Sequence, residues 1–174
     1  MILAEEGAMA HLDCGKVQIY TGDGKGKTTA ALGLAFRAMG YGLDVLMLQF
    51  AKKLRCAEHI EAERSGLRIV QGSRETPEDC AAEIMGLARE ALGTGDVTPV
   101  DVLILDELGE AMRRGFVTRA DVEELIALKP ATTELVLTGR GLLPLADLAD
   151  LVTEMRPVKH YFDQGLLARK GIEY

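Results

Sequence analysis

Cysteine is scarce in this 174-residue chain, and its three copies lie far apart at Cys14, Cys56 and Cys80. An odd number of widely separated cysteines, with no Cys-x2-Cys pair, does not suggest a disulfide framework or a structural zinc site. The same scarcity favours a reducing compartment, and we expect a cytoplasmic protein.

Long apolar runs and an excess of positive charge are also missing. No stretch approaches the roughly 18 consecutive apolar residues of a membrane span, and the N-terminus has neither a basic segment nor an apolar stretch of signal-peptide length. The formal net charge is −7, whereas a general nucleic-acid binder needs cations to neutralise phosphates. We therefore expect a protein that is neither exported nor inserted, with no nucleic-acid and no membrane partner.

Apolar residues are plentiful enough for a substantial core. They make up 48% of the chain, whose length is close to that of one domain. We expect a short N-terminal segment, residues 1–15, followed by a single domain over residues 16–174. The most loop-like stretch, residues 93–99, lies inside that domain, and there is no internal repeat or low-complexity linker.

Short apolar runs suited to buried parallel strands alternate with helix-like stretches. One predicted helix, residues 28–39, stops at Gly40, and another, residues 76–92, begins with Thr-Pro-Glu-Asp and stops at Gly93. The alternation indicates βαβ units, and hence an α/β fold with a mostly parallel sheet and helices on both faces. The predicted strands cover residues 17–20, 45–50, 67–70, 102–105, 135–137 and 151–154.

A glycine-rich stretch, TGDGKGKTT, follows the first predicted strand and opens the first predicted helix. It is similar to the Gly-x4-Gly-Lys-[Ser/Thr] phosphate loop, except that Thr21 stands where the first glycine belongs and the glycine comes one place later, at Gly22. A loop between strand and helix brings backbone N–H groups and the positive end of a helix dipole to one point, where a polyphosphate binds. Lys27 would supply a cation there, and the Thr28 hydroxyl can reach Mg²⁺. A glycine-rich turn that merely contains lysines is the alternative.

Two further segments point to the same edge of the sheet. VDVLILDE is an apolar strand that ends in Asp106 and Glu107, as a Walker B strand does when its terminal carboxylate holds Mg²⁺ or its water shell. In LTGRG a strand opens into a turn with Arg140, whose guanidinium could neutralise phosphate oxygens. We expect the strand before Gly22 at the centre of the sheet, with strand ends at Tyr20, Asp106 and Thr138 on one edge. A solvated acidic pair and a surface arginine are the alternatives.

These segments resemble the P-loop type of ATP:corrinoid adenosyltransferase. Family members carry a shortened loop, Gly-Asn-Gly-Lys-Gly-Lys-Thr-Thr-Ala-Ala, and this chain has GDGKGKTTAA at residues 22–31, so the missing loop residue is a family trait. The resemblance continues in LQF followed by Lys52, in LDEL, in LTGRG and in residues 149–174, and it spans nearly the whole chain from Val17 onward. The loop combined with the C-terminal RPVKH and KGIEY motifs is highly specific.

The resemblance implies an enzyme that transfers the 5′-deoxyadenosyl group of ATP to the cobalt(I) of a corrinoid and releases triphosphate, in the biosynthesis or salvage of adenosylcobalamin. The corrinoid would be cob(I)alamin or cob(I)yrinic acid a,c-diamide. Cobalt(I) is a strong nucleophile that attacks C5′, so the protein's work is orientation and charge stabilisation. The resemblance also implies that ATP lies reversed relative to other P-loop enzymes, which exposes C5′ to the corrinoid.

The resemblance also implies a P-loop NTPase-like (RecA-like) fold and a set of site residues. Lys27, Thr28 and Glu107 match the family's catalytic positions, and Thr28, Asp106 and Glu107 its ligands for Mg²⁺ or Mn²⁺. The implied partners are the corrinoid, a flavoprotein reductant and a second copy of the chain in a homodimer. The implied ATP-binding residues are Gly22, Asp23, Gly24, Lys25, Gly26, Lys27, Thr28, Thr29 and Arg140.

Three departures from the family pattern stand out. Asp23 replaces an asparagine and places a carboxylate beside the phosphates, where it either repels them or helps to hold a metal. The family places Gly-Phe-x-Trp near the corrin, to displace the lower axial ligand of cobalt, whereas this chain has no tryptophan and a polar QGSRET at residues 71–76. DELGEAM replaces Asp-Glu-Leu-Asn-Tyr-Ala-Leu, and the segment before the first strand is shorter than in many members.

Two other classes of function remain open at this stage. A P-loop ATPase or small-molecule kinase would use Glu107, next to Asp106, as a water-activating base. A degenerate homologue would bind a corrinoid or nucleotide without catalysis, although Lys27 and Thr28 are intact.

The histidines give weaker signals. His11 and His59 show no metal-ligand spacing, and we expect both at the surface. Arg156, Lys159 and His160 form either a basic edge near the triphosphate or corrin amides, or a plain solvated cluster.

Overall fold

A six-stranded, fully parallel sheet forms the centre of the protein. The computed structural model describes residues 11–50, 55–94 and 97–174, so Lys52 and part of the predicted loop at residues 93–99 lie outside the described residues. The strand order is β3-β2-β4-β5-β1-β6. The strands are β1 (Val17–Thr21), β2 (Val45–Gln49), β3 (Arg68–Gln71), β4 (Val102–Asp106), β5 (Glu134–Thr138) and β6 (Leu151–Glu154).

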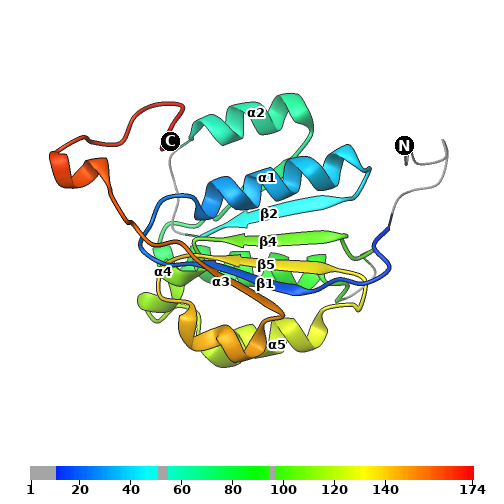
Figure 1. Ribbon diagram of the computed structural model, residues 1–174. Coiled ribbons are helices and arrows are strands. Elements are labelled where there is room, and N and C mark those ends of the chain that lie inside the picture. Colours follow the sequence, from blue (N-terminus) through cyan, green and yellow to red (C-terminus); the bar gives the residue numbers. More distant parts are fainter. Residues whose placement is uncertain (1–10, 51–54, 95–96) are drawn as a thin grey trace.

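Helices cover both faces of this sheet, which confirms the expected α/β class. Figure 1 shows α1 and α2 on one side and α3, α4 and α5 on the other. None of the helices within the described ranges has the length and apolarity needed to traverse a bilayer. The helices are α1 (Lys27–Gly40), α2 (Ala57–Ser65), α3 (Pro77–Ala91), α4 (Leu108–Arg113) and α5 (Arg119–Leu128), with short 3-10 turns η1 (Leu143–Leu148) and η2 (Tyr161–Gln164).

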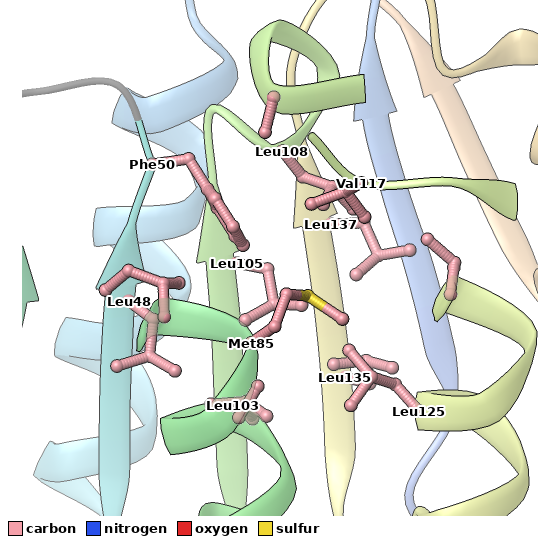
Figure 2. Close-up of a cluster of buried hydrophobic side chains, with 14 of the residues drawn as sticks. Leu48, Phe50, Met85, Leu103, Leu105, Leu108, Val117, Leu125, Leu135 and Leu137 are labelled. Atoms are coloured by element: carbon pink, nitrogen blue, oxygen red, sulfur yellow. The ribbon is translucent and has the colours of Figure 1, made fainter. Parts of the chain in front are cut away.

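The two faces of the sheet are packed differently. Helix α1 presents Ala31, Ala35 and Ala38, whose spacing puts them on one helix face, and these small side chains let the helix lie close to the strands. The opposite face carries larger side chains: Met85 of α3 and Leu125 of α5 pack against leucines of β4 and β5, as Figure 2 shows. Every residue of β4 is buried, because a central parallel strand is covered on both faces.

The expected central position of β1 is wrong. Strands β4 and β5 occupy the centre, and β1 lies between β5 and the edge strand β6. The chain leaving β1 crosses to β2 and skips two positions that β4 and β5 fill later, so only β6 lies beyond β1. The expected alignment of the strand ends is confirmed: the sheet is parallel throughout, and the Thr138 hydroxyl donates to the Asp106 carboxylate at 2.7 Å.

Two loops at the carboxyl ends of the strands touch through glycines. A Cβ added at Gly109, after β4, would lie 2.1 Å from the carbonyl oxygen of Arg140, after β5. A Cβ added at Gly139 would lie 2.4 Å from the backbone nitrogen of Gly109. Only glycine permits this approach, which holds Glu107 and Arg140 near each other.

We predict that Gly109→Ala lowers the free energy of unfolding by about 1–3 kcal/mol, because backbone atoms must move apart to accept the methyl group. The control is Gly86→Ala in α3, where nothing lies within 4 Å of an added Cβ. That change should raise stability by up to about 1 kcal/mol, through helix propensity. Urea unfolding of both variants tests the pair, and equal stabilities would contradict the packing described.

Candidate functional site

The loop between β1 and α1 curls around the ammonium group of Lys27. Its Nζ donates to the carbonyl oxygens of Gly22 and Gly24, each at 2.8 Å, and the residue is only 9% exposed. Burial lowers the pKa of Lys27 from its ordinary value, while the nearby carboxylate of Glu107 opposes that shift. The cation is thus held inside the loop, where a phosphate oxygen could replace the carbonyls.

Thr21, which stands where the usual loop has its first glycine, belongs to β1. Its side chain is fully buried, and its hydroxyl accepts a hydrogen bond from the backbone N–H of Leu142 at 3.0 Å. The phosphate loop therefore begins one residue later, at Gly22, which has a φ of 99°. The motif is one residue short because β1 continues through Thr21, the position where the usual loop begins.

The segment after β6 packs directly on the loop. The N–H of Gly24 donates to the carbonyl of Met155 at 2.7 Å, and the N–H of Met155 donates to the carbonyl of Thr21 at 2.8 Å. A Cβ at Gly22 would lie 2.5 Å from the Met155 oxygen, and one at Gly24 would lie 2.7 Å from it. These two glycines are required for packing as well as for any approach of phosphate.

The carboxylate of Asp106 lies fully buried behind the loop. Its Oδ1 accepts the hydroxyls of Thr28 at 2.8 Å and Thr138 at 2.7 Å, and its Oδ2 accepts the Gln49 amide at 3.1 Å. Because Thr28 donates its proton to Asp106, the lone pairs of its oxygen remain available to a cation.

Glu107 adopts a strained backbone conformation beside this carboxylate. Its φ of 60° and ψ of 25° are left-handed, and it is the only such non-glycine residue in the described part of the chain. Its N–H donates to the Thr138 hydroxyl at 3.1 Å. Such strain often accompanies functional sites.

One pocket of about 610 Å³ collects most of the predicted residues, a volume typical of ligand sites. Gly22 and Asp106 lie behind its wall, the first bonded to Lys27 and the second to Thr28. The oxygen donors here, a hydroxyl and carboxylates, suit a hard divalent cation such as Mg²⁺. The predicted residues that line the pocket are Asp23, Gly24, Lys25, Gly26, Lys27, Thr28, Thr29, Glu107 and Arg140.

The C-terminal segment forms the opposite wall of this pocket. Lys25 Nζ donates to the carbonyl of Ile172 at 2.9 Å, which ties the tail to the phosphate loop. The tail is braced by a cluster in which the Tyr161 hydroxyl and the Arg169 guanidinium both donate to Glu173. Arg169 also lies 5.0 Å from the centre of the Tyr161 ring. The bonds from Arg169 and then Tyr161 lower the pKa of Glu173 to about 2.

The remaining predicted polar residues divide between the pocket and the surface. His160 lines the pocket, whereas Arg156 pairs with Glu154 at 2.6 Å and Lys159 is exposed, so a basic edge does not form as a unit. His11 is exposed, as expected. The expectation for His59 is wrong: it is half-buried and its Nε2 lies 2.8 Å from Gln49 Oε1.

The polar segment at residues 71–76 lies outside the pocket. The backbone N–H and the hydroxyl of Ser73 donate to Glu83 of α3 at 2.7 and 2.8 Å, and Cys80 Sγ donates to the carbonyl of Arg74 at 3.1 Å. These bonds tie the segment to α3, and the two from Ser73 lower the pKa of Glu83.

A parallel α/β sheet with a phosphate loop and a strand-end acidic pair defines a P-loop nucleotide-binding protein. The model of one family, ATP:corrinoid adenosyltransferase BtuR/CobO/CobP, matches residues 13–174. The chain belongs to this family and is an enzyme that transfers an adenosyl group to a corrinoid.

Individual relatives agree with the family match. Corrinoid adenosyltransferase of Escherichia coli K12 is 33% identical over 96% of this chain and 89% of the relative. Corrinoid adenosyltransferase CobA of Salmonella typhimurium is 33% identical with the same coverage. Corrinoid adenosyltransferase of Pseudomonas aeruginosa is 33% identical over 99% of this chain and 90% of the relative.

We predict that Glu173→Gln loosens the C-terminal wall of the pocket, because the amide cannot replace the charged bonds to Arg169 and Tyr161. Hydrogen exchange in residues 161–174 should accelerate, with the sheet unchanged. The control is Glu123→Gln, which removes another exposed pair, with Arg119. Unchanged exchange in the tail of Glu173→Gln would contradict the bracing role.

The same cluster predicts a dependence on pH. The pKa of Glu173 is depressed, so the bracing is fully present above the ordinary value of 4.5 and is lost as the pH falls towards about 2. Tail exchange, corrected for the intrinsic rate, should rise over that window in the wild type and stay level in Glu173→Gln.

Proposed function

We propose that the pocket binds ATP and that the enzyme transfers its 5′-deoxyadenosyl group to the cobalt(I) of a corrinoid, cob(I)alamin or cob(I)yrinic acid a,c-diamide. The observation that carries the proposal is the convergence of the phosphate loop, the Asp106–Glu107 pair and Arg140 on one pocket at one edge of the sheet. The family's name supports ATP as the co-substrate. The product would serve adenosylcobalamin biosynthesis or salvage.

The triphosphate would lie in the loop, against the N–H groups at the start of α1. Lys27 would turn from the carbonyls of Gly22 and Gly24 to phosphate oxygens, and Arg140 would add a second cation. Thr28 and Glu107, with Asp106 behind them, would hold Mg²⁺ or Mn²⁺. When bound, that ion would neutralise charge on the phosphates.

The reaction requires no proton transfer by a side chain. The electron pair of cobalt(I) forms the bond to C5′, the bond between C5′ and its oxygen breaks, and its electron pair leaves on the triphosphate. Lys27 and Arg140 would stabilise the growing negative charge, and Thr28 and Glu107 would keep the leaving group in place. Asp23, at the rim, would either repel the phosphates or help to hold the cation.

A P-loop ATPase or kinase is the second candidate. The position of Glu107 in the pocket favours it, because a carboxylate there can orient water or an acceptor hydroxyl. The family match favours the transferase.

We also propose the domain organisation, the location and the partners of the enzyme. Residues 16–174 would form one P-loop domain after a short segment, residues 1–15, and the protein would act as a cytoplasmic homodimer. A flavoprotein would reduce cobalt(II), and no nucleic acid or membrane would take part.

We predict that Lys27→Ala lowers the adenosylation rate about 10²-fold or more, because a buried cation contact to phosphate contributes roughly 2–4 kcal/mol to the transition state. The rate is followed by the absorbance change on forming the cobalt–carbon bond from ATP, Mg²⁺ and chemically reduced cob(I)alamin. The control is Lys16→Ala, which should retain the wild-type rate. Lys16 lies at the amino ends of the strands, away from the pocket, and forms an exposed ion pair with Asp150. A Lys27→Ala enzyme within a few-fold of wild type would refute the assignment of the loop.

We predict that inorganic triphosphate is the phosphorus product and that it forms only with a cobalt(I) corrinoid present. An ATPase or kinase breaks the bond between the β- and γ-phosphates and releases ADP, whereas this transfer leaves the three phosphates joined. Phosphorus NMR distinguishes the two. ADP formed at a comparable rate without corrinoid would favour the ATPase.

A further inference from the structure

A line of hydrogen bonds runs from the start of α2 to the carboxylate behind the phosphate loop. The Nδ1 of His59 accepts the backbone N–H of Cys56 at 2.9 Å, and its Nε2 lies 2.8 Å from Gln49 Oε1. Gln49 Nε2 then donates to Asp106 Oδ2 at 3.1 Å. The line joins α2, β2 and β4 across the edge of the sheet where the pocket lies.

The direction of every bond in this line follows from its first member. A backbone N–H can only donate, so Nδ1 of His59 is the acceptor and Nε2 carries the proton of the neutral ring. Gln49 Oε1 must then accept from His59, which leaves the Gln49 NH₂ group facing Asp106. A carboxylate can only accept, so this is the one orientation of the amide that satisfies both neighbours.

The orientation of the Gln49 amide is important because Gln49 and Asp106 are both buried. Gln49 is 1% exposed and Asp106 is 0% exposed, so water cannot replace a lost bond. An amide turned the other way would set its oxygen against the Asp106 carboxylate. Gln71 also donates to Gln49 Oε1, but at 3.3 Å it is the longer contact.

A separate metal centre is the rival interpretation of this cluster. Ligand atoms of Cys56, Glu58 and His59 lie within 4.8 Å of one another. Cys56 and His59, however, form the reciprocal capping box of α2, and both ring nitrogens of His59 already take part in hydrogen bonds. A metal at this point would have to break either the helix cap or the bond to Gln49.

We propose that His59 is a positioning residue for the cation-binding side of the ATP pocket. Acting through Gln49, it fixes the Asp106 carboxylate so that Oδ1 faces the Thr28 hydroxyl, which keeps the lone pairs of that hydroxyl free for the divalent cation that accompanies ATP. The inference rests on the proposed function, because it assumes that Thr28 meets a cation bound with ATP. Residues that orient ligands in this way typically change metal affinity 10–100-fold when they are replaced.

Two substitutions separate this role from the helix cap. In His59→Asn the side-chain oxygen can still accept the Cys56 N–H, but position 59 no longer supplies a donor to Gln49 Oε1, which keeps only the longer bond from Gln71. In His59→Gln the oxygen can cap the helix, as glutamine commonly does at this helix position, while the NH₂ group can donate to Gln49. Calorimetric titration with ATP is carried out with Mg²⁺ and with EDTA, and Mn²⁺ binding in the presence of ATP is followed by electron paramagnetic resonance.

The expected result is a loss of affinity confined to the cation-dependent binding of His59→Asn. Its affinity for Mg²⁺-ATP should fall about 10-fold or more. Its affinity for ATP in EDTA and its melting temperature should stay close to the wild-type values. His59→Gln should restore the wild-type affinity. Wild-type affinity in His59→Asn, or an equal loss in EDTA, overturns the proposal.

A double-mutant cycle tests whether His59 acts through Gln49. Gln49→Met nearly keeps the volume of the side chain and removes its bonds to His59, Gln71 and Asp106, so adding His59→Asn to it should cause no further loss of Mg²⁺-ATP affinity. Additive losses overturn the proposal, as does stoichiometric Zn²⁺ held by wild type and lost in His59→Asn. A wild-type protein that fails to bind Mg²⁺-ATP overturns the proposed function itself, whereas wild-type binding with no effect of His59→Asn overturns only this inference.

Discussion

The buried carboxylate of Asp106 is the constraint on which the site depends. A charge removed from water is costly unless donors surround it, and here they come from three elements: Thr28 of α1, Thr138 of β5 and Gln49 of β2. Meeting that demand draws the start of α1 and the ends of three strands together. In the described part of the chain, no buried side-chain nitrogen or oxygen lacks a partner. The pocket lies where these elements meet around the Asp106 carboxylate.

Close backbone contacts also hold the loops around the pocket in place. Gly109 meets the backbone of the turn after β5, and Gly22 and Gly24 meet the backbone of Met155 after β6. These contacts fix the loops from both sides, so the strained φ of Glu107 is held by its neighbours rather than by its own preference. The phosphate loop is one residue shorter than the usual motif because Thr21 extends β1, where its hydroxyl accepts the N–H of Leu142.

The sequence predicts those parts of the structure that depend on neighbouring residues. Continuous apolar runs locate all six strands, and the glycine and lysine spacing locates the loop, because both signals are local. The place of β1 in the sheet, the packing of Met155 on the loop and the burial of His59 depend on residues brought together by crossovers. Helices α2 and α4 are short, and α2 carries mostly polar residues, so they give little periodic signal. Gln49 stands in the recognisable LQF motif, but its role appears only when Asp106 is beside it.

The charge of the pocket bears on the form in which ATP would enter. Its lining holds three cationic side chains against a larger number of carboxylates, so the protein alone offers little net attraction to a polyanion. A divalent cation offsets this excess of negative charge, since the same carboxylates that repel free phosphates attract the ion that accompanies them. The proposed site would therefore favour ATP with its cation over free ATP, and it would also suit a leaving group that departs as one highly charged unit. The charged lining residues are Lys25, Lys27 and Arg140 on one side and Asp23, Glu58, Glu61, Glu107 and Glu173 on the other.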